Sequence, residues 1–121
     1  MIEKENIFYS MFRLPKETRP SHKLWYPAAD VYEVPDGWIV KVELAGVSIE
    51  DIKFEIHENV LHISGIRRDR TCKAGITYRQ MEIIYSRFEK TLSFPEKIDT
   101  SNVEHKYADG LLYIYLKKRV V

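Results

Sequence analysis

Several short runs of this sequence alternate strictly between apolar and polar residues, and this pattern constrains the fold more than any other feature. In the run 51–57 the apolar positions are Ile52, Phe54 and Ile56, with charged or imidazole side chains between them. The same period of two recurs at 38–44, 60–66, 87–94, 103–107 and 111–116. Strands with one dry and one wet face have this period, because successive side chains point to opposite faces of a sheet. The sequence therefore predicts an all-β protein built of short strands.

Turn-forming residues separate these runs. Pro35-Asp36-Gly37 precedes the first run, and Glu58-Asn59 lies between two others. Asp109-Gly110 joins the last two runs, and both residue types tolerate the positive φ of a hairpin turn. Many short strands with tight turns and no long helical period predict an immunoglobulin-like antiparallel β-sandwich.

The chain divides into three regions. Its 121 residues suit one domain with short tails. Residues 1–27 contain prolines that break any long helix, so we expect a short flexible N-terminal arm there. Residues 28–118 form the predicted sandwich, and residues 119–121 form a short C-terminal tail. The large apolar residues of the arm are Ile7, Phe8, Tyr9, Met11, Phe12 and Leu14.

The charge balance excludes some classes of partner. Nineteen basic and 18 acidic residues leave a formal net charge of +1, so no global field draws the protein to nucleic acid or to an anionic membrane. No apolar stretch reaches the roughly 18 residues of a membrane span, and the first residues lack a secretory signal. The single cysteine, Cys72, rules out an intramolecular disulfide and fits a reducing compartment. We therefore expect a cytoplasmic protein.

The segment 67–80 departs from the strand pattern. It opens with Arg67-Arg68-Asp69-Arg70, contains Gly75 and becomes strand-like again at Ile76-Thr77-Tyr78. It is too long for a tight hairpin and too polar for a core. A loop of this length inside a small domain usually has a function.

Several short motifs follow one another in a fixed order. They are Asp30-Val31-Tyr32-Glu33, Val40-Lys41-Val42-Glu43-Leu44-Ala45-Gly46-Val47, Glu50-Asp51-Ile52, Val60-Leu61-His62-Ile63-Ser64-Gly65-Ile66-Arg67, Phe88-Glu89-Lys90-Thr91-Leu92-Ser93-Phe94-Pro95 and Asp109-Gly110-Leu111-Leu112. This ordered series, with its gaps, resembles the α-crystallin domain of the small heat-shock protein family over residues 28–118. The resemblance implies an ATP-independent holdase chaperone, which binds unfolding client proteins and prevents their aggregation.

The resemblance implies two surfaces for unfolded clients. The first is the arm, whose apolar side chains, methionine included, adapt to varied shapes. The second is a groove between the strands at 52–56 and 103–107. It is lined by Ile52, Phe54, Ile56, Val103 and Tyr107.

The resemblance also implies a homodimer formed by exchange of the long loop. Its Ile76, Thr77 and Tyr78 would pair with the edge of a second copy's first strand. On that strand the contact residues would be Asp30, Tyr32 and Val34.

Two positions depart from the family pattern in ways that affect assembly. Lys90 stands where the family normally has arginine, and alternation places it inward or across an interface, where lysine cannot form a bidentate pair. The usual Ile-x-Ile or Val-x-Val extension has no counterpart in Lys117-Lys118-Arg119-Val120-Val121. We therefore expect a dimer or a small oligomer.

Some features have both a functional and a plain interpretation. His57 and His62 lie across a turn, but no cysteine or carboxylate completes a metal site, so surface histidines are favoured and no metal is expected. Cys72 is either a redox-sensitive thiol or an incidental loop cysteine, with the latter favoured. The basic runs 67–70 and 117–119 either contact nucleic acid or lipid or are solvated loop ends, and the latter is favoured. Tyr113 and Tyr115 make the second face of the last strand apolar, so this face is either covered by another part of the chain or is an interaction surface.

Two other classes of function compete with the holdase. A co-chaperone or binding module of the CS-domain kind would share the sandwich but recognise a specific folded partner. An enzyme is disfavoured, because the sequence contains no Walker loop, Rossmann glycine series or Gly-x-Ser-x-Gly motif. We accordingly expect no cofactor and no catalytic residues.

Overall fold

The computed structural model describes residues 24–71 and 73–120, and this part of the chain folds as a β-sandwich. The strands are β2 (Ala29–Val34), β3 (Gly37–Glu43), β4 (Ile52–His57), β5 (Val60–Ile66), β6 (Arg87–Ser93), β7 (Glu104–Ala108) and β8 (Leu111–Lys117). A single 3-10 turn, Ile49–Asp51, precedes β4, and the described residues contain no α-helix. The prediction of an all-β antiparallel sandwich is confirmed.

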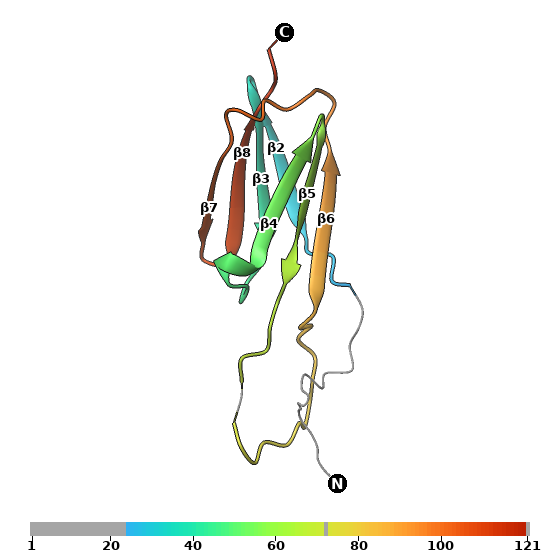
Figure 1. Cartoon of the computed structure of the whole chain (residues 1–121), viewed down its shortest axis with the longest axis vertical. Helices are drawn as coiled ribbons and strands as arrows, with labels where there is room; N and C mark the ends of the chain where they lie inside the picture. The colour runs from blue at the N-terminus through green and yellow to red at the C-terminus, as the bar shows by residue number, and fades with distance from the viewer. Residues whose placement is uncertain (1–23, 72, 121) are drawn as a thin grey trace.

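The strands form two antiparallel sheets (Figure 1). The larger sheet has the order β2-β3-β8-β7, and the smaller has the order β4-β5-β6. The strands β2, β4, β6 and β7 are therefore sheet edges. This arrangement matters for function, because an edge strand presents unpaired backbone groups to any chain that lies beside it.

The alternating residues fill the space between the sheets. In β3 the side chains of Trp38, Val40 and Val42 are at most 2% exposed, and Leu61 and Ile63 of β5 are fully buried. Ile52, Phe54 and Ile56 of the edge strand β4 are only partly buried and pack against this core. The same alternation thus yields full burial in inner strands and half burial in an edge strand.

Two tight turns fix the register of the hairpins. Glu58 has a φ of 60° between β4 and β5, while Asp109 and Gly110 have φ values of 55° and 78° between β7 and β8. Two-residue hairpin turns need such positive φ values, since their twist matches the twist of the strands. The predicted turns at these positions are confirmed.

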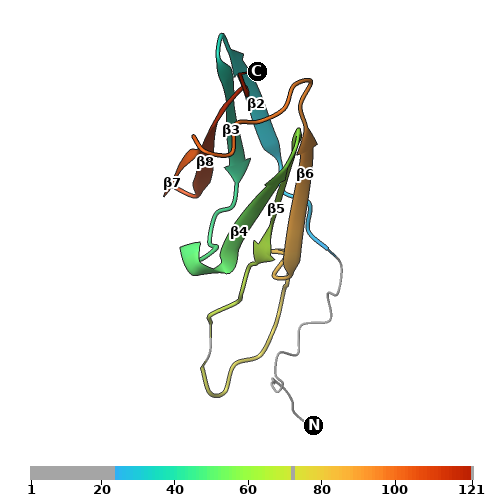
Figure 2. The same ribbon diagram turned by 45° about the horizontal axis from the view of Figure 1, so that its top comes forward.

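The long loop between β5 and β6 projects from one end of the sandwich (Figures 1 and 2). The sequence predicts a strand-like run at Ile76-Thr77-Tyr78, but no described residue between Ile66 and Arg87 belongs to a strand. The physical reason is that no strand of the same chain lies beside this run to complete the hydrogen bonds of a ladder.

The segment before β2 packs on the sandwich. The N–H of Trp25 donates to the carbonyl oxygen of Arg87 at 2.9 Å, and the N–H of Glu89 donates to the carbonyl oxygen of Trp25 at 3.2 Å. The Trp25 ring meets the Phe88 ring edge-on, with centroids 5.7 Å apart, and Pro27 is fully buried. Trp25 therefore covers the beginning of the β6 edge.

Candidate functional site

The edge strands β4 and β7 lie on the same side of the sandwich. The rings of Phe54 and His105 meet edge-on with centroids 5.4 Å apart and so join the two strands. Val103 lies just before β7, and Tyr107 lies on it; both are partly buried against the core. Ile52, Phe54 and Ile56 of β4 are likewise partly buried against the core, and we call these five residues the β4–β7 surface.

Both edges of the β4–β7 surface keep free backbone groups. The turns at 58–59 and 109–110 contain two residues each. The two residues on either side of such a turn therefore bond to each other through their backbone N–H and C=O groups. Alternation then leaves the N–H and C=O groups of Phe54 and Ile56, and of His105 and Tyr107, pointing away from the sheets. The Tyr107 hydroxyl donates to the carbonyl oxygen of Leu44 at 2.6 Å, which fixes its ring.

The strand β2 presents a third open edge. The Glu43 N–H donates to the Ala28 carbonyl oxygen, so alternation turns the N–H and C=O groups of Ala29, Val31 and Glu33 outward. The side chain of Val31 is 44% exposed although it shares the inner face with buried Val40 of β3. Asp30, Tyr32 and Val34, the predicted contact residues, lie on the opposite face of the strand.

The projecting loop carries an unusual amount of exposed apolar surface. Every described residue from 73 to 84 is exposed. Five large apolar side chains among them, Ile76, Tyr78, Met81, Ile83 and Ile84, are 39% to 58% exposed. The strand-like pattern of the sequence predicts a role for Ile76 to Tyr78 but not for the other three; the apolar run that ends in Ile83-Ile84-Tyr85 is the signal that marks them.

Arg67 lies where the loop leaves the sandwich, although its place in a basic run predicts a solvated side chain. Its Nε donates to the Ile84 carbonyl oxygen at 2.9 Å, and its Nη1 donates to the Ala45 carbonyl oxygen at 3.1 Å. Its guanidinium carbon is 3.7 Å from the centre of the Trp25 ring. Burial lowers the pKa of the Arg67 guanidinium, which the neighbouring Tyr85 and Glu43 partly offset. This arginine is thus a structural junction.

Lys90 lies half-buried on the inner face of β6, opposite Ile63 of β5. Its face also holds Phe88 and Leu92, as alternation predicts. Its ammonium makes no hydrogen bond or ion pair with the described residues.

The remaining predicted residues either lie away from the β2 edge of their own chain or fall outside the described residues. The loop residues Ile76 to Tyr78 do not contact β2 of their own chain, since the loop extends beyond the end of the sandwich (Figure 2). The arm residues Ile7, Phe8, Tyr9, Met11, Phe12 and Leu14, and Cys72, lie outside the described residues.

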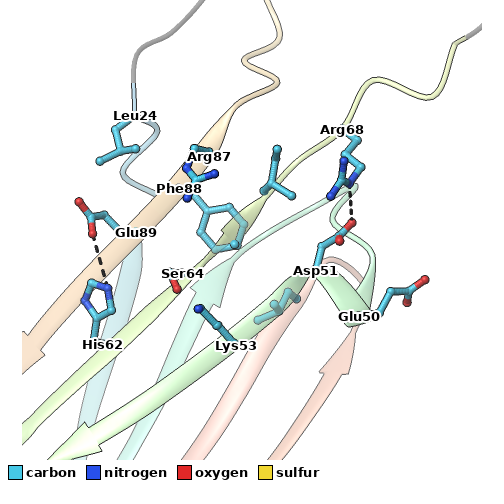
Figure 3. A pocket seen from close by; sticks show the side chains of 13 residues that line it. Leu24, Glu50, Asp51, Lys53, His62, Ser64, Arg68, Arg87, Phe88 and Glu89 are labelled. Carbon is cyan, nitrogen blue, oxygen red and sulfur yellow. Dashed lines mark hydrogen bonds and ion pairs between the residues drawn. The ribbon is translucent and has the colours of Figure 1, made fainter. Parts of the chain in front are cut away.

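A pocket of about 600 Å³ lies over the outer face of the β4–β5–β6 sheet, beneath Leu24 (Figure 3). Its wall contains the ion pair between Arg68 and Asp51, at 3.2 Å, and the contact between His62 and Glu89, at 3.5 Å. Because cations and anions alternate around it, the pocket has no net preference for one charge. It is a solvated face of the sandwich.

The remaining ambiguous features of the sequence have structural roles. Arg68 and Arg70 both contact Asp51, and Lys117 and Lys118 pair with Asp36 and Glu33. Tyr113 and Tyr115 are half-buried on the outer face of β8, where the Lys106 ammonium lies 5.0 Å from the Tyr113 ring centre. In the part of the chain that the structure describes, no three histidine, cysteine, aspartate or glutamate side chains cluster to hold a metal.

A family model described as the Hsp20/alpha crystallin family matches residues 30–121, three quarters of the chain. The chain belongs to this family. The resemblance inferred from the ordered motifs is therefore confirmed. Small heat-shock proteins are non-enzymatic chaperones, so membership supports a chaperone role in general.

Curated relatives and solved structures agree with this assignment. A 22.7 kDa class IV heat shock protein of Pisum sativum is 33% identical over 82% of this chain, which spans 51% of that relative. Small heat shock protein C4 of Rickettsia felis is 29% identical over 94% of this chain and 70% of its own length. The structure of heat shock protein 16.0 from Schizosaccharomyces pombe has a TM-score of 0.73 at 32% identity, covering 78% of this chain and 87% of that one.

A second solved structure extends the likeness at lower identity. A small heat-shock protein from Xylella fastidiosa has a TM-score of 0.70 at 23% identity, covering 82% of this chain and 91% of its own. At that identity the comparison shows the sandwich fold alone. In the segments 24–71 and 73–120, no helix is long and apolar enough to cross a membrane.

Proposed function

We propose that this chain is an ATP-independent holdase that binds unfolding proteins along its open strand edges and through its N-terminal arm. The observation that carries the proposal is the β4–β7 surface. It combines free backbone N–H and C=O groups with the half-buried apolar side chains of Ile52, Phe54 and Ile56. An unfolded chain offers matching backbone groups and apolar residues whatever its sequence, whereas a folded protein has both sequestered.

Edge pairing supplies a low specificity that suits a holdase. Main-chain hydrogen bonds give affinity without reading side chains, and apolar contacts add roughly 25 cal/mol for each Å² of apolar area removed from water. Binding unfolded chains in preference to folded ones withdraws them from aggregation, and this requires no nucleotide. The arm residues Ile7 to Leu14 would add adaptable apolar contacts to the same client.

Light scattering of a heat-aggregating enzyme, without ATP, tests the holdase. Three variants separate the surfaces: a chain that starts at Leu24, Ile56→Lys on the β4–β7 surface, and Glu55→Lys on the exposed face of the same strand. The deletion ends at Lys23 because Trp25 and Pro27 pack on the sandwich. Binding at the strand edge is supported if Ile56→Lys weakens the suppression of aggregation and Glu55→Lys preserves it. Binding by the arm is supported if the shortened chain no longer suppresses aggregation.

The outcome that contradicts the holdase is equally concrete. If several-fold excess of the full chain leaves aggregation unchanged, the proposal fails. The chain would then be a binding module for a folded partner, and capture from a lysate would follow.

We also propose that two copies form a dimer by exchanging their loops, with the exposed run at 73–84 of each copy pairing with the β2 edge of the other. The loop needs a strand beside it, and β2 offers outward-facing backbone groups at Ala29, Val31 and Glu33. The net charges are opposite, because the loop run carries Lys73, Arg79 and Glu82 while β2 carries Asp30 and Glu33. Half-buried Lys90 would then gain a carboxylate partner from the second copy.

Val31→Pro tests the exchange with little disturbance of the single chain. Proline removes the outward N–H of Val31, which the β2–β3 ladder does not use. Tyr32→Pro is the matched control, since it removes an N–H that points toward β3 and so damages the sandwich itself. We expect Val31→Pro to be a folded monomer in native mass spectrometry. An unchanged dimer in this variant, or after deletion of Gly75 to Tyr78, contradicts the exchange.

A further inference from the structure

Arg67 contacts three segments that are distant in the sequence. Its Nε holds the returning limb of the loop at Ile84, and its Nη1 holds the turn after β3 at Ala45. Its guanidinium carbon lies over the Trp25 ring, 3.7 Å from the ring centre. The backbone N–H of Arg67 donates to the Ser86 carbonyl oxygen at 2.9 Å and closes the base of the loop. One side chain therefore joins both limbs of the loop to the segment that precedes β2.

Trp25 is the corresponding anchor of the N-terminal segment. It is tied to the β6 edge by its two backbone hydrogen bonds with Arg87 and Glu89, and its ring rests on Phe88. Beyond Trp25 toward the N-terminus, Leu24 is the last residue that the structure describes. Figures 1 and 2 show this segment and the base of the loop at the same end of the sandwich.

The chemistry of the junction requires arginine. A planar guanidinium can donate to two carbonyl oxygens and stack on an aromatic face at the same time, whereas an ammonium has no flat surface to stack. Without the two donated bonds, the carbonyl oxygens of Ile84 and Ala45 lose their side-chain partner. The contact to Ile84 exists only while the loop leaves the sandwich in the observed direction.

We propose that Arg67 couples the position of the long loop to the anchoring of the N-terminal segment at Trp25. Movement of the loop withdraws Ile84 and frees the guanidinium, which loosens Trp25; release of Trp25 loosens the loop in turn. Such coupling is reciprocal, because each partner changes the equilibrium of the other by the same factor. The consequence for chaperone activity, that subunit pairing regulates the arm, rests on the proposed function, but the coupling itself does not.

Residue-resolved amide hydrogen exchange tests the coupling in the absence of any client. The N–H groups of Trp25 and Glu89 report the anchor, and the N–H of Arg67 reports the base of the loop. The variants are Arg67→Lys, Trp25→Leu and the combination of both. Arg68→Lys is the matched control, because Arg68 contacts Asp51 and neither segment of the junction.

The expected result is reciprocal and non-additive. Arg67→Lys lowers the protection of the Trp25 and Glu89 amides about fivefold or more, and Trp25→Leu lowers that of the residue 67 amide by a similar factor. In the Arg67→Lys background, Trp25→Leu has no further effect at residue 67. Arg68→Lys leaves all three amides unchanged.

Two results would overturn the coupling. One is that Trp25→Leu leaves the Arg67 amide unchanged, or that the two effects multiply in the double variant. The other is that the amide of Leu44, which donates to the Gly110 carbonyl oxygen in the core, loses protection equally, since this indicates a general loss of stability. If Trp25→Leu does not fold, Trp25→Phe, which keeps a smaller aromatic face, supplies the same cycle.

Discussion

The Phe88 ring of β6 packs directly against the backbone of Gly65 on β5. A β-carbon placed on Gly65 would lie 2.6 Å from Cζ of Phe88 and 2.0 Å from the carbonyl oxygen of Asp51. These distances are shorter than any real contact, so only glycine allows the ring to occupy this site. The Trp25 ring meets the same Phe88 ring edge-on, with centroids 5.7 Å apart.

Gly65→Ala is therefore expected to destabilise the protein. The added methyl group must displace Phe88 and the Asp51 carbonyl, and such overpacking costs about 1–3 kcal/mol. Urea denaturation measures the loss of unfolding free energy. Gly75→Ala is the control, because a β-carbon there meets nothing within 4 Å and only the backbone preference changes. A Gly65→Ala midpoint no lower than that of Gly75→Ala would contradict the packing.

The strands could be predicted from the sequence, because they follow from local alternation. Ile52, Phe54 and Ile56 mark one face of a strand by spacing alone. The position of that strand at a sheet edge is set by the topology of the two sheets, which no local pattern contains. The hairpin at Asp109-Gly110 could also be predicted, because the turn needs positive φ values and these two adjacent residue types tolerate them.

The junction at Arg67 could not be predicted in this way. Its partners Trp25, Ala45 and Ile84 lie 17 to 42 positions from Arg67 in the chain, and no local pattern relates them to it. Within the run Arg67-Arg68-Asp69-Arg70, nothing distinguishes the one arginine that lies over a tryptophan ring. The expected strand at Ile76 failed for a related reason, since a strand exists only with a partner beside it.

Tyr107→Phe is expected to lower the unfolding free energy by about 1 kcal/mol, because the Leu44 carbonyl oxygen loses the hydroxyl that bonds it at 2.6 Å. Thermal and urea denaturation measure the change. Tyr113→Phe provides the control, since the contact observed there is between the ring and the Lys106 ammonium. Equal stability of the two variants would show that the Tyr107 hydroxyl bond contributes nothing.

Lys90→Met is expected to raise the stability of the folded single chain by about 0.5–1 kcal/mol. Methionine keeps the length of the side chain on the face that holds Phe88 and Leu92 and leaves no charge at this half-buried position. The measurement uses the Val31→Pro background, in which we expect no dimer. Lys97→Met is the control, as Lys97 is exposed and pairs with Glu58 at 3.0 Å. A loss of stability in Lys90→Met would show that the ammonium has a partner within its own chain.

The unfolding free energy is expected to fall at both low and high pH. The ion pair between Asp36 and Lys117 contributes to the acid decrease and to the alkaline decrease. The hydrogen bond and charge of Lys117 hold the pKa of Asp36 below its ordinary value of 3.8. This contribution is therefore fully present above pH 3.8 and is lost as the pH falls through the lowered pKa. Asp36 in turn raises the pKa of Lys117 above its ordinary 10.5, so the alkaline contribution is present below that pH and is lost as the pH rises through the raised pKa.

Asp36→Asn should accordingly flatten both limbs when unfolding midpoints are measured from pH 2 to 11 at low salt. The effect should shrink in 1 M salt, because both side chains are exposed and ions screen their attraction. Glu50→Gln is the control, since Glu50 makes no ion pair with the described residues. Acid and alkaline limbs that are identical in Asp36→Asn and in the wild-type protein would show that this pair does not contribute to folding.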